Sequence, residues 1–521
     1  MHPLIWRAWL GSTVAALCLA SLAACDGKSR SGHAPGQPSA GKAPPPALAP
    51  GERAAMEDQS SAQTPSPDPS PDPPRARDEA SSPSPSPSPS PSPSSVATPS
   101  TQSWPKATRL SNGLRVIRLP SGGGGQAVAL LAFALGSAAD PPGQVGMTHL
   151  IEHLLLRAPS PPGRPSMESL ATSMNGETLQ GLSYVYLVTA KGKLGELVGA
   201  LAARWQKLTV DEATVREETR RMLVEKSFVE RSAPARLHNG VYARAYAQSR
   251  PYRWGKLGLL ETKGPFAVKD TARFFESHYV PSRALLILGG ELPPGELDRG
   301  ALGALKGIPA RRAPAIAPMV HVRAPQPKAP LVVEDPQTTG WQLLVAWPSP
   351  AALGDEDLAL TLAGMLLQQR LFFRLGAAGG GSWVSAQNDL LSGPGHLFLA
   401  QLAGPFPKAS TPEQGLAALH EEIARLGVPT EAELAVLAAA HRQGLVFSIR
   451  LPASGAPRPA WEAAVQSAIN LARVELVLGE GREALFDRMA KLRPSDVGRA
   501  ATRYLKPGLG AVGILRGRKP Q

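Results

Sequence analysis

The chain contains 521 residues, including 54 prolines and 51 glycines, and carries a formal net charge of +13 at pH 7. This length allows two or three folded domains, but the prolines are unevenly placed, so part of the chain is not expected to fold. The basic residues are scattered, apart from short groups such as Arg311-Arg312, with no dense basic cluster interleaved with aromatic residues. We therefore expect no nucleic-acid partner.

Residues 1–24 have the pattern of a secretory signal peptide. Arg7 precedes an apolar run of about 13 residues, which is too short to span a bilayer and ends in small residues. The ending Leu22-Ala23-Ala24-Cys25 resembles the lipobox of bacterial lipoproteins, which implies that Cys25 is lipidated and becomes the new N-terminus. The alternative is an ordinary signal peptide in which Cys25 is incidental. Cys18 leaves with the signal peptide, so no free thiol remains for a disulfide or a metal.

The lipoprotein resemblance implies a place in the bacterial cell envelope. Acyl chains on Cys25 would anchor the protein to the periplasmic side of a membrane, since each buried methylene contributes ~0.8 kcal/mol. Asp26 follows Cys25 directly, and in bacterial lipoproteins an Asp there favours the inner membrane, although inner and outer membrane both stay open. Residues 25–103 are rich in Pro and Ser and almost free of aliphatic and aromatic residues, which predicts a disordered tether.

The folded part is expected to span residues 104–521 and to alternate strands with helices. Asn112-Gly113 is typical of a type I′ turn and predicts a hairpin at its start. The sequence then predicts, in chain order, a strand at 128–135, a helix that includes residues 146–153, a strand at 184–188 and a core-facing helix at 194–208.

The most informative stretch is His149-Leu150-Ile151-Glu152-His153, on the first of these helices. Helical geometry places the two His one turn apart, with Glu152 on nearly the same stripe. Two imidazoles at this spacing can bind one Zn²⁺, and the carboxylate can accept a proton from a metal-bound water. The alternative is an amphipathic helix with a few polar residues on its solvent face. A third ligand would favour the metal site.

A later helix supplies candidates for that ligand. Thr209-Val210-Asp211-Glu212 predicts a capping box at its start. Glu218 and Glu225 then share one helix face with apolar residues. Unpaired carboxylates on a buried face are costly, which favours contact with a metal, a His or a cation. The alternative is that the two acids pair with Arg220 and Arg221 on a solvated face.

Together these residues resemble the pitrilysin and mitochondrial processing peptidase family of zinc metallopeptidases, the inverzincins. The resemblance rests on His149-x-x-Glu152-His153, with Glu225 at 225 − 153 = 72 positions after the second His and Glu218 seven before Glu225. It implies that His149, His153 and Glu225 bind one Zn²⁺ per chain. It also implies that Glu152 is the general base and that Glu218 supports the site.

Two further parts of the sequence join the resemblance. Asn175-Gly176-Glu177-Thr178 corresponds to the family's Asn-Ala-x-Thr segment, with Gly in place of Ala, which borders the substrate strand. Asn175 is therefore the candidate for a contact to the substrate backbone. In the family the second domain closes on the substrate, often with an Arg and a Tyr. Arg374 is the candidate Arg, followed by Ser382-Trp383 where the Tyr would be expected.

The second half of the folded part repeats features of the first. Asp270-x-x-Arg273 and Asp496-x-x-Arg499 are each followed, at the same offset, by a proline and an apolar run. We therefore predict an α+β protein of two tandem homologous α/β-sandwich domains, in which a mixed sheet with helices is duplicated. The predicted boundaries are 104–315 for an N-terminal zinc peptidase domain and 316–521 for a C-terminal domain without a metal site.

The resemblance implies a membrane-anchored zinc endopeptidase that hydrolyses extended or unfolded polypeptides with a metal-activated water. Glu152 would take the proton from that water and return it to the leaving amine. The competing prediction is a non-catalytic, peptidase-like subunit that binds polypeptide beside an active partner. By the same resemblance we expect a homodimer, or a heterodimer with a related subunit.

Overall fold

The computed structural model describes residues 104–122, 124–247, 266–292, 300–316, 325–376, 382–393, 395–449 and 459–517. The predicted signal peptide, the lipidated Cys25, Asp26 and the tether lie outside these ranges. Of the helices within them, none combines the length and the apolar character that a membrane crossing needs.

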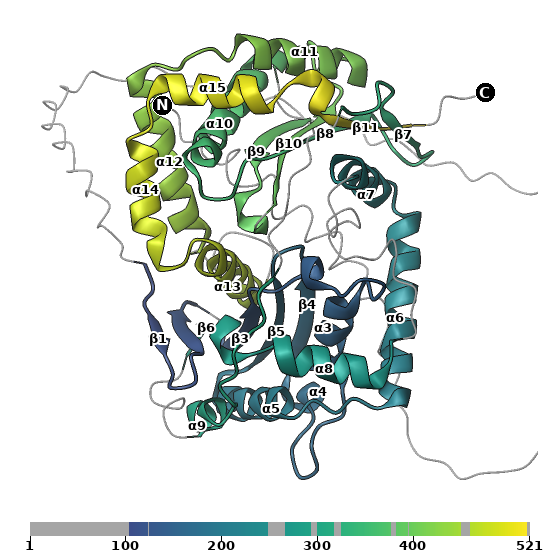
Figure 1. The fold of residues 1–521 in the computed structure, drawn as a ribbon, viewed down its shortest axis with the longest axis vertical. Coiled ribbons are helices and arrows are strands. Elements are labelled where there is room, and N and C mark those ends of the chain that lie inside the picture. The colour runs from purple at the N-terminus through teal and green to yellow at the C-terminus, as the bar shows by residue number, and fades with distance from the viewer. Residues whose placement is uncertain are drawn as a thin grey trace, which may run out of the picture. The chain divides into compact units, whose positions relative to one another are not determined.

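The first half of the chain builds a six-stranded mixed sheet. Its strands are β1 (Ala107–Arg109), β2 (Arg115–Pro120), β3 (Gln126–Phe133), β4 (Ser173–Thr178), β5 (Ser183–Ala190) and β6 (Ala284–Gly290). They lie in the order β1-β2-β6-β3-β5-β4 (Figure 1). Only β2 and β6 pair in parallel, and the other neighbours are antiparallel. The order makes β4, which carries Asn175, an edge strand of this sheet.

Seven helices are formed by the described residues of this half. They are α3 (Met147–Arg157), α4 (Met167–Leu170), α5 (Leu194–Gln206), α6 (Glu212–Arg231), α7 (Ala233–Ala245), α8 (Val268–His278) and α9 (Ala301–Lys306). Side chains alternate between the two faces of a strand, so β3 contributes to two separate cores. Ala129, Leu131 and Phe133 pack in one core with α3 and α5, whereas Val128 and Leu130 belong to a second core.

The second half builds a five-stranded mixed sheet. Its strands are β7 (Leu331–Glu334), β8 (Trp341–Pro348), β9 (Trp383–Asn388), β10 (Leu397–Gly404) and β11 (Ala511–Arg516), in the order β7-β11-β8-β10-β9. Its helices are α10 (Asp355–Leu375), α11 (Pro412–Arg425), α12 (Glu431–Ser448), α13 (Ala460–Val477), α14 (Arg482–Ala490) and α15 (Pro494–Tyr504).

The two sheets have the same core topology. In the first half α8, a short turn at Pro281–Arg283 and β6 follow one another, and in the second α15, a turn at Pro507–Leu509 and β11 do the same. β6 and β11 each pair with one parallel and one antiparallel neighbour. The predicted fold class, an α+β protein with a duplicated mixed sheet, is confirmed. Residues 317–324 lie outside the described ranges, and the exact domain boundary stays a prediction.

Each half also covers one face of the other half's sheet, which the sequence did not predict. α13, from the second half, packs on β3 and β6 of the first sheet, and α7, from the first half, packs on β7, β8 and β11 (Figure 1). Ala468, Leu471 and Ala472 of α13 are fully buried in this way.

Two local predictions were wrong. β1 and β2 form the expected antiparallel hairpin. Asn112, however, does not have the positive φ that a type I′ turn requires, because Leu353 is the only described non-glycine residue with one. Its side-chain amide instead donates to the carbonyl oxygens of Leu305 and Ile308, at 2.7 and 3.0 Å. Thr209 does not cap α6. Asp211 does, accepting from the backbone N–H of Thr214 at 2.8 Å.

Candidate metal centre

The motif helix α3 is fixed at its N-terminal end by a buried carboxylate. Asp140 accepts hydrogen bonds from the backbone N–H groups of Gly146 and Thr148, at 2.7 and 2.8 Å, and from the Thr148 hydroxyl at 2.6 Å. These bonds satisfy N–H groups that have no partner within the helix. Burial, opposed by these bonds, raises the pKa of Asp140 to about 6. Asp140 therefore sets where α3 begins.

The other end of α3 is fixed by a buried guanidinium. Arg204, on α5, is 1% exposed, and its Nη1 donates to the carbonyl oxygens of Leu156 and Leu155 at 2.5 and 3.2 Å. Desolvation lowers the pKa of this side chain. Sequence analysis missed Arg204, although it lies on the apolar stripe of α5, three residues after the buried Leu201.

The two motif His and Glu225 of α6 meet at one point. His149 Nε2 and His153 Nε2 are 3.1 Å apart, and the two oxygens of Glu225 lie 3.4 Å from the first nitrogen and 3.5 Å from the second. In a tetrahedral zinc site with bonds of about 2.0–2.1 Å, ligand atoms are roughly 3.3 Å apart. The two ring nitrogens and the carboxylate therefore have the chemistry and approximate spacing of zinc ligands. They are the one such group among the described residues.

Glu218 orients the second His from behind. His153 Nδ1 lies 3.1 Å from Glu218 Oε2, and both side chains are buried. A carboxylate can only accept, so Nδ1 carries a proton, and loss of the second ring proton directs the Nε2 lone pair at His149 and Glu225. Arg221 lies 3.3 Å from the other oxygen of Glu218. The sequence left open that Glu218 and Glu225 pair with Arg220 and Arg221. The Glu218–Arg221 contact is present, but Arg220 pairs with Glu217.

The electrostatics of the cluster favour a cation. Burial acts to lower the pKa of His153, but hydrogen bonds to Glu218 and Glu225 outweigh it and raise the pKa to about 9. Burial acts to raise the pKa of Glu225, but hydrogen bonds to His149 and His153 hold it well below its usual range. Without a metal, the extra proton on His153, between Glu218 and Glu225, supplies the positive charge. A metal ion that binds there displaces this proton.

Glu152 is buried beside the cluster and has its own support. The Thr178 hydroxyl donates to Glu152 Oε2 at 2.7 Å, and burial raises the pKa of this carboxyl above its ordinary value. A Cβ atom on Gly176 would lie 2.5 Å from Glu152 Oε1, so this glycine leaves room for the carboxylate. The sequence marked Thr178 and Gly176 only as part of a substrate-bordering segment, and their contacts to Glu152 were missed.

Asn175 and Arg374, the two residues predicted to contact the substrate, lie in different halves of the chain. Asn175 is half-buried on the edge strand β4, and its side-chain oxygen accepts from the backbone N–H of Gly176 at 2.8 Å. Arg374, at the end of α10, makes ion pairs with Glu421 and with Glu422 of α11. Its charge is thus already balanced within the second half, and its contact to a substrate stays a prediction.

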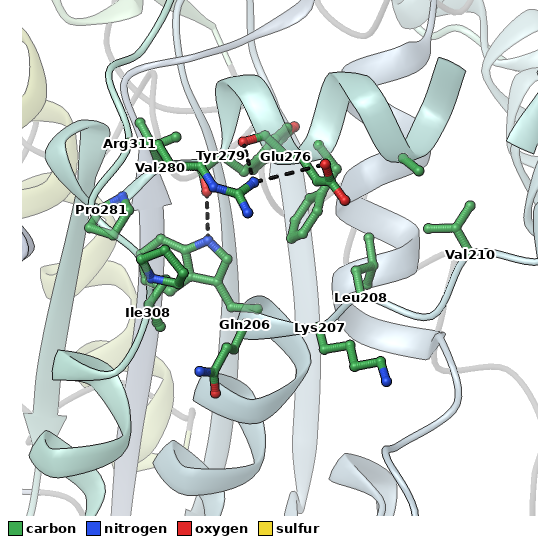
Figure 2. Close-up of a pocket in the computed structure, with 14 residues that line it drawn as sticks. Gln206, Lys207, Leu208, Val210, Glu276, Tyr279, Val280, Pro281, Ile308 and Arg311 are labelled. Atoms are coloured by element: carbon green, nitrogen blue, oxygen red, sulfur yellow. Dashed lines mark hydrogen bonds and ion pairs between the residues drawn. The ribbon is translucent and has the colours of Figure 1, made fainter. Parts of the chain in front are cut away.

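A small cavity of about 130 Å³ lies away from the metal cluster (Figure 2). It is enclosed by the end of α5, by α8 and by residues 308–311. Trp205 Nε1 donates to the carbonyl oxygen of Tyr279 at 2.7 Å, and Arg311 Nη1 donates to that of Glu276 at 3.2 Å. It contains none of the motif residues, so we place the candidate site at the metal cluster.

Comparison with known proteins identifies the fold. Residues 266–439 match the family model described as "Peptidase M16 inactive domain". A protease from Helicobacter pylori is similar with a TM-score of 0.59 and 18% identity, covering 79% of this chain and 99% of that chain. A structure described as an M16-like peptidase from Alicyclobacillus acidocaldarius gives 0.59 and 15%, covering 80% of this chain and 98% of that one.

A peptidase M16 inactive domain from Pseudomonas fluorescens gives a TM-score of 0.56 and 15% identity, covering 80% of this chain and 98% of that one. No curated protein matches the sequence. The chain thus has the two-sheet fold of M16-like peptidases, and the matched region 266–439 is of the inactive type. The resemblance drawn from the sequence is confirmed at this level.

Proposed function

We propose that this protein is a zinc-dependent endopeptidase that hydrolyses peptide bonds of extended or unfolded polypeptides. The observation that carries the proposal is the convergence of His149, His153 and Glu225 from two helices, with Glu152 buried beside them. Three protein ligands are the number found in catalytic zinc sites, where a fourth position is left for water or substrate. The M16-like peptidase fold supports the same reading.

Zinc held by these three residues would act as a Lewis acid that lowers the pKa of water and polarises the scissile carbonyl. The part played by Glu152 follows from its surroundings. Because burial raises its pKa, this carboxylate is a stronger proton acceptor than a solvated one. The Thr178 hydroxyl holds it in place. Glu152 accepts the proton of the attacking water and returns it to the leaving amine.

The edge strand β4 suits a substrate of extended conformation. Among the described residues β4 pairs only with β5, so its other edge can pair with the backbone of a polypeptide. Such pairing draws affinity from main-chain hydrogen bonds and tolerates many sequences. Asn175, in the middle of this strand, is the proposed side-chain contact to the substrate backbone.

A non-catalytic subunit that binds polypeptide in a heterodimer is the second candidate. The observation that favours it is the match to an inactive-type domain. The matched residues 266–439 contain none of the four site residues, which all lie between 149 and 225. The match therefore covers α8 and β6 of the first half together with part of the second half, and the proposed site lies outside it.

Activity and metal content together separate the two candidates. We expect one zinc per chain and cleavage of unstructured, fluorogenic peptides by wild type. Glu152→Gln should keep the zinc and lose cleavage, whereas Glu225→Ala should lose both. Glu217→Gln, an exposed change on the same helix as Glu225, is the control and should keep both. Zinc-loaded wild type that cleaves no peptide, alone or with a related subunit, would favour the non-catalytic candidate.

We further propose that the protein is a bacterial envelope lipoprotein anchored through Cys25, and that it works as a homodimer or as a heterodimer with a related subunit. The first part predicts an acylated N-terminal peptide in the membrane fraction. Cys25→Ser should release the protein from that fraction. The second part predicts a particle mass, by light scattering of detergent-solubilised protein, of at least two chains. A monomer in every preparation would reject it.

A further inference from the structure

The helix that carries the third metal ligand is held tightly only over its first half. All four fully buried residues of α6 lie between Val215 and Met222. Glu225 follows them, with 43% of its side chain exposed, and Phe228 is 52% exposed. Packing within the first half of the chain therefore holds α3 and the start of α6, but it does not fix the stretch of α6 around Glu225.

A single residue links that stretch to the next helix. Ser232 is both the C-terminal cap of α6 and the N-terminal cap of α7, and Pro234 lies in the first turn of α7. Glu225 precedes Ser232 by roughly two helical turns. A one-residue link with caps on both sides leaves little freedom between the helices, so a shift of α7 is passed on to the end of α6.

α7 in turn docks on the sheet of the second half. Leu237, Val241 and Tyr242 share a core with residues of β8, β10 and β11. The Tyr246 hydroxyl donates to the carbonyl oxygen of Gly395 at 2.8 Å. The approach is close: a Cβ atom on Gly513 of β11 would lie 2.4 Å from Val241 Cγ2 and 2.7 Å from Leu237 Cδ1.

We infer that the docking of α7 on the second sheet sets the position of Glu225, and that Gly513 and Val241 are positioning residues for this ligand. The inference rests on the proposed zinc site and adds a role for the second half, which holds no metal cluster among its described residues. A side chain on Gly513 pushes α7 off the sheet, and the displacement moves Glu225 away from His149 and His153.

The test measures zinc affinity of the full chain by competition with a chromophoric chelator. We expect Gly513→Ala to weaken zinc binding about tenfold, which is the low end of the effect of disturbing the support of a ligand. The double variant Gly513→Ala/Val241→Ala removes the nearer of the two close contacts and leaves the one to the flexible end of Leu237, so it should restore part of the affinity. Val497→Ala deletes the same atoms from an equally buried valine outside the α7 core, and it should leave zinc affinity unchanged.

The same measurement in a Glu225→Gln background shows whether the effect passes through this ligand. Gly513→Ala should then cause no further loss of affinity. Should Gly513→Ala fail to fold, Gly240→Ala is the milder variant, because its new Cβ would meet only the flexible end of Leu331. It should weaken binding in the same direction.

Three results would overturn the inference. Wild-type affinity in both glycine variants would show that α7 does not control the ligand. An equal loss with and without Glu225 would show that the effect runs elsewhere. Failure of the wild type to bind zinc at all would remove the proposed function together with the inference, whereas the first two results would leave the proposed function standing.

Discussion

Replacing Glu218 by Gln tests how the metal cluster is supported. The change keeps the shape of the side chain that lies 3.1 Å from His153 Nδ1, but it removes the charge. A neutral amide makes the ring a poorer ligand and holds its orientation less firmly. Changes to such supporting residues typically cost about 10–100-fold in metal affinity, or roughly 1.4–2.7 kcal/mol.

The size of this loss should depend on pH. In the metal-free protein the pKa of His153 is raised to about 9, with Glu218 and Glu225 as the causes that overcome burial. A proton on His153 competes with the metal, so wild-type affinity should rise about tenfold per pH unit up to pH 9 and then level off. Glu218→Gln lowers the pKa of His153 and so weakens this competition. The deficit of the variant is therefore smaller at pH 7 than at pH 9.

Chelator competition from pH 7 to pH 10 measures both effects at once. Glu217→Gln is the matched control, because this residue lies next to Glu218 on α6 but is exposed and paired with Arg220. Its affinity profile should overlay that of the wild type. A Glu218→Gln profile parallel to the wild type at every pH would refute the link between Glu218 and the His153 proton. An unchanged zinc affinity of Glu218→Gln would refute the inference that Glu218 supports His153 as a ligand.

Three further predictions concern catalysis, stability and assembly. Thr178→Val removes a hydrogen bond, worth about 1 kcal/mol, that lowers the pKa of Glu152. The acid limb of the pH–rate profile should therefore move to higher pH, and kcat/KM at neutral pH should fall about fivefold. Thr178→Ser keeps the hydroxyl, so its pH profile and its kcat/KM should match those of the wild type. Arg204→Met leaves two carbonyls at the end of α3 without their charged donor and should lower the free energy of unfolding by about 3 kcal/mol in urea titrations, with Arg204→Lys in between. A fragment ending at residue 316 lacks α13, which covers one face of its sheet, so it should aggregate when expressed alone. Co-expression with residues 317–521 should make it soluble. A fragment that is soluble alone and unfolds cooperatively would contradict this prediction.

The ligand cluster could be predicted from the sequence because helical periodicity is local. The offset of four between His149 and His153 fixes their relative placement on any helix, and Glu225 stood out as an acid on an apolar face. Periodicity also marked the buried stripe of α5, yet Arg204 was missed, because the pattern shows which face is buried and not what it meets. The exchange of α7 and α13 between the sheets was missed for the same reason. An apolar helix face does not specify the sheet on which the helix packs.

The second copy of the fold shows why, among the described residues, the candidate metal cluster lies in the first half. Asp357 is the third residue of α10, as His149 is the third residue of α3, and Asn388 ends β9 as Thr178 ends β4. Asn388 Nδ2 donates to Asp357 Oδ1 at 2.6 Å, and His396 Nε2 lies 2.8 Å from the same oxygen. Here two donors meet one carboxylate oxygen, so protein groups satisfy Asp357, whereas His396 Nδ1 has no hydrogen-bond partner.

In the first copy two ring nitrogens and a carboxylate face a common point instead, at 3.1 to 3.5 Å from one another. Such a set is acceptor-rich once Glu218 holds the Nδ1 proton of His153. It is completed only by a proton or a cation. The duplicated fold thus closes one site with internal hydrogen bonds and leaves the other able to take a cation, which is why we place the proposed chemistry on α3 and α6 and propose that the second half positions them.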